Sequence, residues 1–382
     1  SIAFLKTNST QMQAKSGQGI KNKELITSKD IGTDFSYKHE IVWKNVVVFA
    51  ILHCLGIWGI KILKLLLFYN IVKTTFNFRF IFCFSATVLM ICLGQGITSG
   101  AHRLFAHRSY KARTPLKLYL TLMQTGSGQN SIYIWVRDHR LHHRYSDTDA
   151  DPHNSNRGFF FSHIGWLMAK KHPYVKEFGK NIDMSDLKAD SMVMFQKKYY
   201  WYLYGLIAFF IPVIVPWYMG ETFKNSLLVC YFARYILQLN GTWLVNSAAH
   251  LYGTRPYDKN IQPVESWFVS LLAFGEGWHN YHHTFPWDYK AAELTQFLNL
   301  SAKFIEIWEK WGLAYDLKSA SPEMVAKRIL KVGDGTHYYL GNDEDKLGVT
   351  AIGPLHPLNP TYNVTYPAPN TILSEAGLIF NQ

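Results

Sequence analysis

Half of the histidines in this sequence, eight of sixteen, fall in three short motifs, HxxxxH once and HxxHH twice. In chain order they are His102 and His107 in "HRLFAH", His139, His142 and His143 in "HRLHH", and His279, His282 and His283 in "HNYHH". Positions i, i+3 and i+4 share one face of a helix, so each HxxHH motif directs three imidazoles toward one place. Imidazole binds zinc, copper, iron and nickel, and the pattern therefore indicates a metal site.

Eight imidazoles exceed the four ligands of a tetrahedral zinc ion, and they suit two metal ions of higher coordination number. Isolated histidines are usually ordinary surface or core residues. We assign that role to seven histidines outside the three motifs, which are His39, His53, His153, His163, His172, His337 and His356.

An acidic stretch, "YSDTDADPHN", follows the second motif. Carboxylates often accept the second ring N–H of a ligand histidine and orient the ring. The same residues also serve as helix caps and turn residues. Both roles are open for Asp138, Asp147, Asp149 and Asp151.

Four apolar segments could position the motifs at a membrane. A helix needs about 20 apolar residues to cross about 30 Å of hydrocarbon, and the segments at about 45–68, 79–99, 199–219 and 225–249 approach that length. Short connections at 69–78 and 220–224 join them into two hairpins. Pro212 and Pro216 would kink or end the third helix. Arg234 in the fourth segment must face the bundle, in either a structural ion pair or a functional role.

The sequence thus predicts an all-α membrane protein: four transmembrane helices in two hairpins, with a mainly helical cytosolic cap from 100–198 and 250–332. The block 99–198 carries sixteen Lys and Arg residues, so the positive-inside rule puts both polar blocks and both termini in the cytosol. In this topology the chain crosses the membrane twice between His143 and His279, so all three histidine motifs lie on the same side of the membrane.

We divide the chain into a polar N-terminal segment (1–40), a main domain (41–332) and an extended or disordered tail (333–382), which is rich in Gly, Pro and Asn. The formal net charge is +12, but the basic residues are spread out and form no nucleic-acid-binding module. All four cysteines lie in apolar runs without a CxxC motif, which argues against a disulfide scaffold and a zinc–thiolate site.

Beyond the histidine motifs, the sequences "GAHRLFAHRSYKAR", "WVRDHRLHHRYSDTDADPHN", "NSAAHLYGTRPYDKNIQP" and "GEGWHNYHHTFPWDY" occur in this order. Over roughly residues 40–332 the chain resembles the animal membrane acyl-CoA desaturases, the stearoyl-CoA desaturase-like family, and insect members in particular. The resemblance implies an endoplasmic reticulum enzyme that uses O₂ and two electrons to introduce a double bond into a saturated fatty acyl-CoA. It also implies electrons from cytochrome b5 and an NAD(P)H-dependent reductase.

By this resemblance, nine histidines would bind two iron ions (Fe²⁺), and the di-iron centre itself would be the catalytic group, without a separate side-chain acid or base. One iron would take His102, His107, His139, His143 and His282. The other would take His142, His250, His279 and His283, with Asn246 reaching it through a water molecule. The implied acyl-CoA contacts are Asn45, Asn130, Arg137, Asp138, Lys170, Lys171 and Trp243, and the residues at the bend of the acyl tunnel are Gln129 and Thr242.

Gly126, Gly128 and Trp278 depart from the family pattern near the expected tunnel, and they leave the double-bond position and the preferred chain length open. Cleaving an unactivated C–H bond requires a redox metal with oxygen, which zinc cannot provide. Three alternative functions remain open beside desaturation: a related membrane di-iron hydroxylase, a metal-binding membrane transporter or store, and a non-catalytic homologue.

Overall fold

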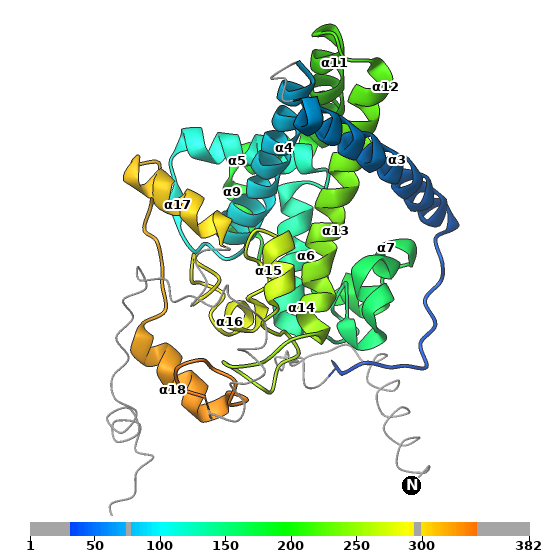
Figure 1. Ribbon diagram of the computed structural model, residues 1–382. Coiled ribbons are helices and arrows are strands. Elements are labelled where there is room, and N and C mark those ends of the chain that lie inside the picture. The colour runs from blue at the N-terminus through cyan, green and yellow to red at the C-terminus, as the bar shows by residue number, and fades with distance from the viewer. Residues whose placement is uncertain (1–30, 74–77, 294–298, 342–382) are drawn as a thin grey trace, which may run out of the picture.

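The computed structural model of this chain describes residues 31–73, 78–293 and 299–341. These residues are predominantly helical (Figure 1). Their one sheet is a two-stranded antiparallel pair, β1 (Lys111–Ala112) with β2 (Ala314–Tyr315), in which Lys111 lies opposite Tyr315.

Long helices cover all four apolar segments of the sequence. In chain order they are α3 (Trp43–Lys73); α4 (Phe78–Gln95) continued by the π-helix η1 (Gly96–Ala106); α10 (Ser191–Tyr204), η4 (Gly205–Phe210) and α11 (Ile211–Tyr218); and α12 (Phe223–Asn225), η5 (Ser226–Ala233) and α13 (Arg234–Asn246). Two helical stretches, Trp43–Phe68 and Ser191–Tyr218, are long and apolar enough to cross a membrane.

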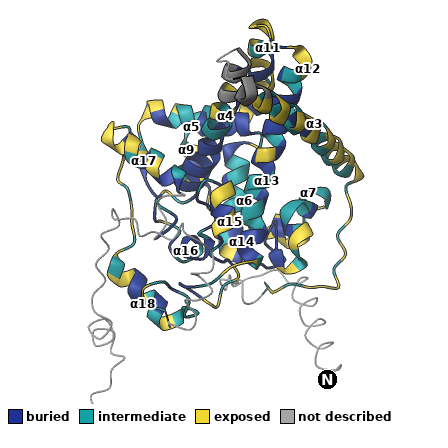
Figure 2. Cartoon of the chain, in the orientation of Figure 1, coloured by how far each residue is buried: buried dark blue, intermediate teal, exposed yellow. Residues whose placement is uncertain are grey.

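The outer face of α3 is apolar and exposed, as the yellow stretch of this helix in Figure 2 shows. Trp43 and Leu65 are each 69% exposed. The inner face packs closely: a Cβ added at Gly59 would lie 2.0 Å from the carbonyl oxygen of Leu228 in η5. A contiguous apolar surface of this kind is costly in water and suits a lipid environment.

The third long helix runs on through Pro212 instead of ending there. Pro212 has no N–H to donate, which leaves the Ala208 carbonyl free for another donor. Nη2 of Arg234 donates to that carbonyl at 3.1 Å. The helix ends after Tyr218, and Gly220 follows in the left-handed region at φ 106°.

Arg234 is buried among neutral acceptors. Its Nε donates to the Cys230 carbonyl at 2.8 Å and its Nη1 to Gln238 Oε1 at 3.3 Å. Within the described residues, no carboxylate lies within ion-pair distance of its guanidinium. Carbonyl dipoles therefore take the place of the structural ion pair that the sequence allowed, and the contacts tie α13 to the helix that carries Ala208.

Shorter elements form the cap that holds the histidine motifs. Before the third long helix these are α5 (Thr114–Ser127), α6 (Ile132–Tyr145), η2 (Ser155–Arg157), η3 (Phe161–Gly165), α7 (Trp166–Met168), α8 (Pro173–Gly179) and α9 (Ser185–Ala189). After the fourth come α14 (Ala248–Leu251), α15 (Trp267–Leu272), α16 (His279–Thr284), α17 (Leu300–Lys310) and α18 (Pro322–Val332). Both α5 and α6 pack against η1. One apolar cluster, with Phe105, Ile132 and Val136 at its centre, joins η1 to α6.

Residues from both predicted terminal segments pack onto this cap. The backbone N–H of Asp34 donates to Asp149 at 2.8 Å, and the buried His337 ring contacts Glu293 Oε2 at 3.1 Å. The remainder of the predicted N-terminal segment and tail, 1–30 and 342–382, lies outside the described residues.

Candidate metal centre

The three histidine motifs and His250 converge from four elements. His102 lies on η1 with His107 just after it, the second motif lies on α6, His250 lies on α14, and the third motif lies on α16. Five of these imidazoles are buried, namely His102, His142, His250, His279 and His282. Their ligand atoms gather in two groups, and within each group the atoms all lie within 4.8 Å of one another.

The first group has five members: His102, His107, His139, His143 and His282. Their Nε2 atoms face one another closely. The His102–His282 distance is 2.9 Å, His107–His139 is 2.8 Å, and His143–His282 is 3.0 Å. The second group has four members, His142, His250, His279 and His283. In it, His142–His283 is 3.3 Å and His279–His283 is 3.1 Å.

The spacing alone predicted that each HxxHH motif directs all three rings toward one place, and this prediction is wrong. On α6 the i and i+4 rings, His139 and His143, join the first group, and the i+3 ring joins the second. On α16 the division is reversed. Successive residues turn by about 100° around a helix, so the i+3 and i+4 side chains diverge enough to reach neighbouring centres.

These distances test whether metal ions fit. Metal–imidazole bonds of about 2.0–2.1 Å at right angles place adjacent nitrogens about 2.9 Å apart, and tetrahedral angles place them about 3.4 Å apart. The observed separations of 2.8–3.3 Å lie mostly near the first value. The buried Nε2 of His250 has no hydrogen-bond partner in the described structure. Both groups therefore fit metal ions of high coordination number.

In three of the nine imidazoles, a carboxylate contacts Nδ1, the ring nitrogen that faces away from the group. Nδ1 of His142 contacts Asp151 at 2.8 Å, and Nδ1 of His250 contacts Asp147 at 3.0 Å. Nδ1 of His102 contacts Glu276 at 2.9 Å, and Glu276 also pairs with the buried Arg103 at 3.0 Å. A ring whose Nδ1–H donates to a carboxylate presents its Nε2 lone pair to a metal ion.

Two of the four acidic residues near the second motif contact histidine rings, and the other two form ion pairs instead of the caps or turns that the sequence allowed. Asp147 and Asp151 contact ligand rings, whereas Asp138 pairs with Arg137 and Lys171, and Asp149 pairs with Arg157 at 2.7 Å. Glu276 was missed by the sequence reasoning. Its position three residues before His279 is the only signal, and that spacing alone does not distinguish it from an ordinary loop residue.

Six imidazoles have a pKa well below the ordinary histidine value; we call them the six low-pKa imidazoles. They are His107, His139, His143, His279, His282 and His283, and the causes are burial first and then repulsion by neighbouring imidazoles. Burial also opposes charge on His142, but the Asp151 carboxylate outweighs it and raises that pKa. Burial raises the pKa of the Asp147 carboxyl group, but the neighbouring His250 outweighs this effect and lowers that pKa to about 2. A neutral ring with a free lone pair is the form that binds metal.

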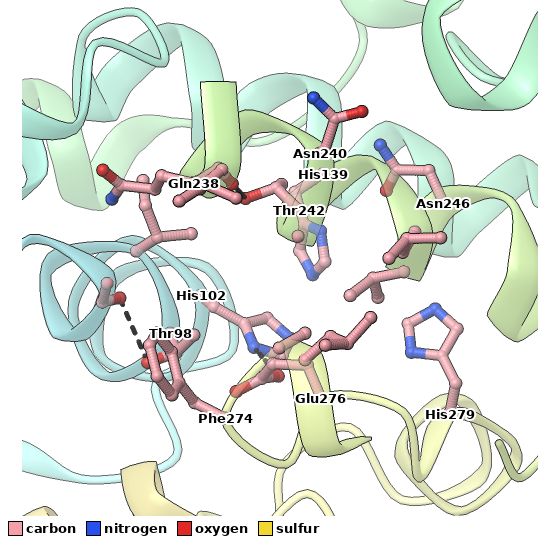
Figure 3. A pocket seen from close by; sticks show the side chains of 18 of the residues that line it. Thr98, His102, His139, Gln238, Asn240, Thr242, Asn246, Phe274, Glu276 and His279 are labelled. Atoms are coloured by element: carbon pink, nitrogen blue, oxygen red, sulfur yellow. Dashed lines mark hydrogen bonds and ion pairs between the residues drawn. The ribbon is translucent and has the colours of Figure 1, made fainter. Parts of the chain in front are cut away.

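A largely apolar cavity of about 330 Å³ adjoins both groups. In Figure 3, His102, His139, Asn246 and His279 surround one side of this cavity, and Thr98, Gln238 and Phe274 line the other. Met90 and Gly94 on α4 and Leu237 and Gly241 on α13 also line it. The cavity thus leads from the imidazoles along the long helices, with space for an apolar chain.

The expected tunnel residues lie together beside the imidazoles. Nε2 of Gln129 donates to Thr242 Oγ1 at 2.8 Å, and the indole N–H of Trp135 reaches Gln129 Oε1 at 3.4 Å. The Trp135 ring stacks on His139 with 4.8 Å between ring centroids. Thr242 and Trp135 line the cavity. These hydrogen bonds hold three side chains from three segments in place.

Of the expected head-group residues, three form one charged cluster. Nη2 of Arg137 contacts Asp138 at 2.7 Å, and Nζ of Lys171 contacts the same carboxylate at 2.6 Å. Asp138 neutralises one of these two cations, so the cluster keeps one positive charge. Lys170 instead pairs with Glu40 at the surface, at 2.7 Å.

The other three expected head-group residues make separate contacts. Nδ2 of Asn45 donates to the Leu167 carbonyl at 2.8 Å, which links α3 to the cap. Asn130 is exposed and has a left-handed backbone, with φ 69°. Trp243 is buried against Phe49 and His163.

The glycines that depart from the family pattern sit where side chains would collide. A Cβ at Gly126 would lie 2.6 Å from Leu93 Cδ2, and one at Gly128 would lie 2.7 Å from a Tyr235 ring carbon. Gly128 also ends α5 in the left-handed region, with φ 74°. The positions are thus dictated by packing of α5 against the long helices.

The isolated histidines lie outside both groups. His153 is buried, with its Nδ1 3.2 Å from Asp151, and it supports that carboxylate. His163 bridges Ser247 and Asn240 at 3.0 and 3.1 Å, and Asn240 also contacts His53. His356 lies outside the described residues.

The chain is similar to known proteins over most of its length. Residues 78–296 match the family model described as fatty acid desaturase. An acyl-CoA Delta-9 desaturase of Acheta domesticus is 51% identical over 312 residues, which are 81% of this chain and 84% of that protein. Stearoyl-CoA desaturase of Homo sapiens is 50% identical over 303 residues, 79% of this chain and 81% of that protein. Stearoyl-CoA desaturase 4 of Mus musculus is 50% identical over 309 residues, with shares of 78% and 82%.

Proposed function

The chain belongs to the fatty acid desaturase family and is an acyl-CoA desaturase, and we propose that it forms the double bond at two iron ions held by nine histidines. In the balanced reaction, two adjacent methylenes, O₂, two electrons and two protons give a carbon–carbon double bond and two water molecules. The convergence of nine imidazoles in two groups beside an apolar cavity carries this proposal.

The two histidine groups are the proposed iron sites, five ligands for one ion and four for the other. Asn246, which lines the cavity with His142 and His279, would complete the second site through a water molecule. When bound, iron with O₂ supplies the oxidant that an unactivated C–H bond requires.

The chain's own residues perform the remaining tasks. Asp147, Asp151 and Glu276 orient ligand rings by accepting their Nδ1–H groups. The apolar cavity wall would exclude water and align the acyl chain with the imidazoles, so that two particular carbons lie beside the metal site. Gln129 and Thr242 are proposed to set the bend of that chain.

We place the coenzyme A head group at the Arg137–Asp138–Lys171 cluster, with Asn45, Asn130, Lys170 and Trp243 as further contacts. Arg and Lys side chains suit the phosphates of coenzyme A. In the acyl-CoA complex, we expect the phosphates to compete with the Asp138 carboxylate for Arg137 and Lys171. The distance from this anchor to the imidazoles would then select the carbons that react.

The exposed apolar faces of the long helices support membrane insertion. We propose four transmembrane helices with the cap and both termini in the cytosol, in the endoplasmic reticulum membrane. Electrons would come from cytochrome b5 and an NAD(P)H-dependent reductase.

Expression in a desaturase-deficient yeast tests this function. We expect new unsaturated fatty acids, whose double bonds mass spectrometry locates, and two iron ions per purified chain. His142→Ala should abolish the product and lower the iron content, whereas His39→Ala, outside both groups, should retain both. Unsaturated product from His142→Ala, or hydroxylated product from the unmodified chain, would contradict the proposal.

A further inference from the structure

Phe274 lines the apolar cavity with a backbone conformation that is rare for its residue type. It lies in the turn that follows α15, and Figure 3 shows its side chain in the cavity wall. Its φ is 57°, in the left-handed region. Bulky L-residues seldom adopt this region, and backbone strain in a native structure often marks a functional position. The fold thus accepts a strained backbone to hold the ring at this place.

Contacts on two sides hold the strained turn. The Ala273 N–H donates to the Val269 carbonyl in α15, and the Gly275 N–H donates to the Ser270 carbonyl, each at 2.8 Å. On the other side, a Cβ added at Gly275 would lie 2.6 Å from Cα of Asn299, the residue before α17. The turn therefore cannot relax without moving α15 or the start of α17.

The Phe274 ring occupies the space that a side chain at position 94 would need. A Cβ added at Gly94 on α4 would lie 2.6 Å from Cε2 of this ring and 3.1 Å from its Cδ2. Gly94 precedes His102 by eight residues on the continuous helix of α4 and η1, which is about two helical turns. In the acyl-CoA complex, the ring would therefore meet the chain beyond the carbons at the metal site.

The same turn fixes the ring relative to the first histidine group. Glu276 follows Phe274 by two residues, and its carboxylate contacts His102 Nδ1 at 2.9 Å and Arg103 at 3.0 Å. Only Gly275 separates the residue that lines the cavity from the residue that orients a ligand ring. Because the turn is held at both ends, the distance from the imidazoles to the Phe274 ring has little freedom to change.

We propose that Phe274 is a specificity-determining residue whose ring limits the length of the acyl chain beyond the metal site. The inference deepens the proposed function, because it requires an acyl chain in the apolar cavity. A smaller side chain enlarges the cavity and admits additional methylenes, whereas the strained turn prevents the ring from moving aside. One methylene more or less in an apolar pocket changes selectivity by about 10–200-fold.

The test measures binding of palmitoyl-CoA, stearoyl-CoA and arachidoyl-CoA to the purified iron-loaded chain in detergent, without a reductant so that no turnover occurs. Phe274→Ala should shift the ratio of dissociation constants toward the longer chains by about tenfold. Phe274→Gly should do the same, and it remains available if the alanine variant does not fold, because glycine adopts φ 57° without strain. Phe268→Ala is the matched control, since its ring is exposed on α15 and does not line the cavity. It should leave the ratio unchanged.

A double variant tests whether the ring acts through its contact with α4. Gly94→Ala alone should shift the ratio toward shorter chains, because its methyl group pushes the ring into the cavity. In combination with Phe274→Ala this shift should disappear, which is the non-additive result expected for residues in contact. Additive effects of the two substitutions, or an unchanged ratio in both Phe274 variants, would overturn the proposal.

The products formed in yeast provide a second readout. The double bond made by Phe274→Ala should stay at the position that the unmodified chain gives it, because the ring lies beyond the reacting carbons. A displaced double bond with an unchanged length preference would overturn the proposal. A chain whose length preference responds to Phe274→Ala but which yields no unsaturated product would refute the proposed function and leave the length limit standing.

Discussion

Replacing Asp151 by Asn should weaken metal binding at the second histidine group. The Asp151 carboxylate is fully buried. One of its oxygens accepts from His142 Nδ1 and from the backbone N–H of Asp147, each at 2.8 Å, and the other accepts from the backbone N–H of His153 at 3.0 Å. An amide has only one acceptor oxygen, so its NH₂ group must face one of these N–H donors in either orientation.

The cost has two parts. Leaving a buried donor unpaired costs about 1–3 kcal/mol of folding stability. Loss of the charged partner that orients a ligand ring typically lowers metal affinity by about 10–100-fold, or about 1.4–2.7 kcal/mol. We therefore expect iron at the second group to be lost first when a chelator is titrated, and the first group to retain its iron.

The assay is iron content per chain after dialysis against a graded chelator series, with Mössbauer spectra to distinguish the two sites. Asp149→Asn is the matched control, since Asp149 is equally buried in the same loop but contacts Arg157 and Asp34 instead of a ligand ring. If both variants lose iron alike, or if Asp151→Asn retains two ions as firmly as the unmodified chain, the orienting role is refuted.

Three further predictions concern packing, chain length and pH. Gly128→Ala forces an L-residue to φ 74° and places its Cβ within 2.8 Å of two tyrosine rings, so the free energy of unfolding should fall by about 2–4 kcal/mol and the melting temperature should fall with it. Gly205→Ala, whose Cβ would have nothing within 4 Å, should leave the melting temperature unchanged. Gly94→Ala adds a methyl group 2.6 Å from the Phe274 ring in the cavity wall, and competition between acyl-CoAs should then favour shorter chains; an unchanged preference would contradict this. The six low-pKa imidazoles stay neutral in the metal-free fold while the unfolded chain binds protons below about pH 6.5, so the metal-free stability should fall from pH 7.5 to 5.5. Two groups oppose this trend, because Asp151 raises the pKa of His142 and burial raises the pKa of Glu265 to about 8. A melting temperature that rises on acidification would contradict the prediction.

Local patterns in the sequence were sufficient for the helices and for most of the metal centre. The apolar segments coincide with long helices because a run of about 20 apolar residues can satisfy its backbone only within itself in lipid. The spacing of the histidine motifs predicted eight of the nine imidazoles that converge. His250 has no neighbouring histidine, and only the family resemblance of "NSAAHLYG" indicated it.

Long-range contacts could not be predicted in this way. Asp147 contacts His250 across 103 positions, and Glu276 contacts His102 from a distant loop. Which charge meets which ring depends on how the cap elements pack, and periodicity along one element contains no information about its neighbours.

The sequence by itself identified eight of the nine imidazoles that converge and the helical periodicity of the two HxxHH motifs. The motif spacing did not divide the imidazoles between two groups, and only the family resemblance implied the division that the structure has. The tertiary structure alone decided which carboxylates orient the rings. Helical periodicity fixes the direction of a side chain relative to its own axis, but the position of a shared centre depends on several axes at once. Those axes are placed by the packing of the elements, in which η1 packs against α6 and α13 against α14.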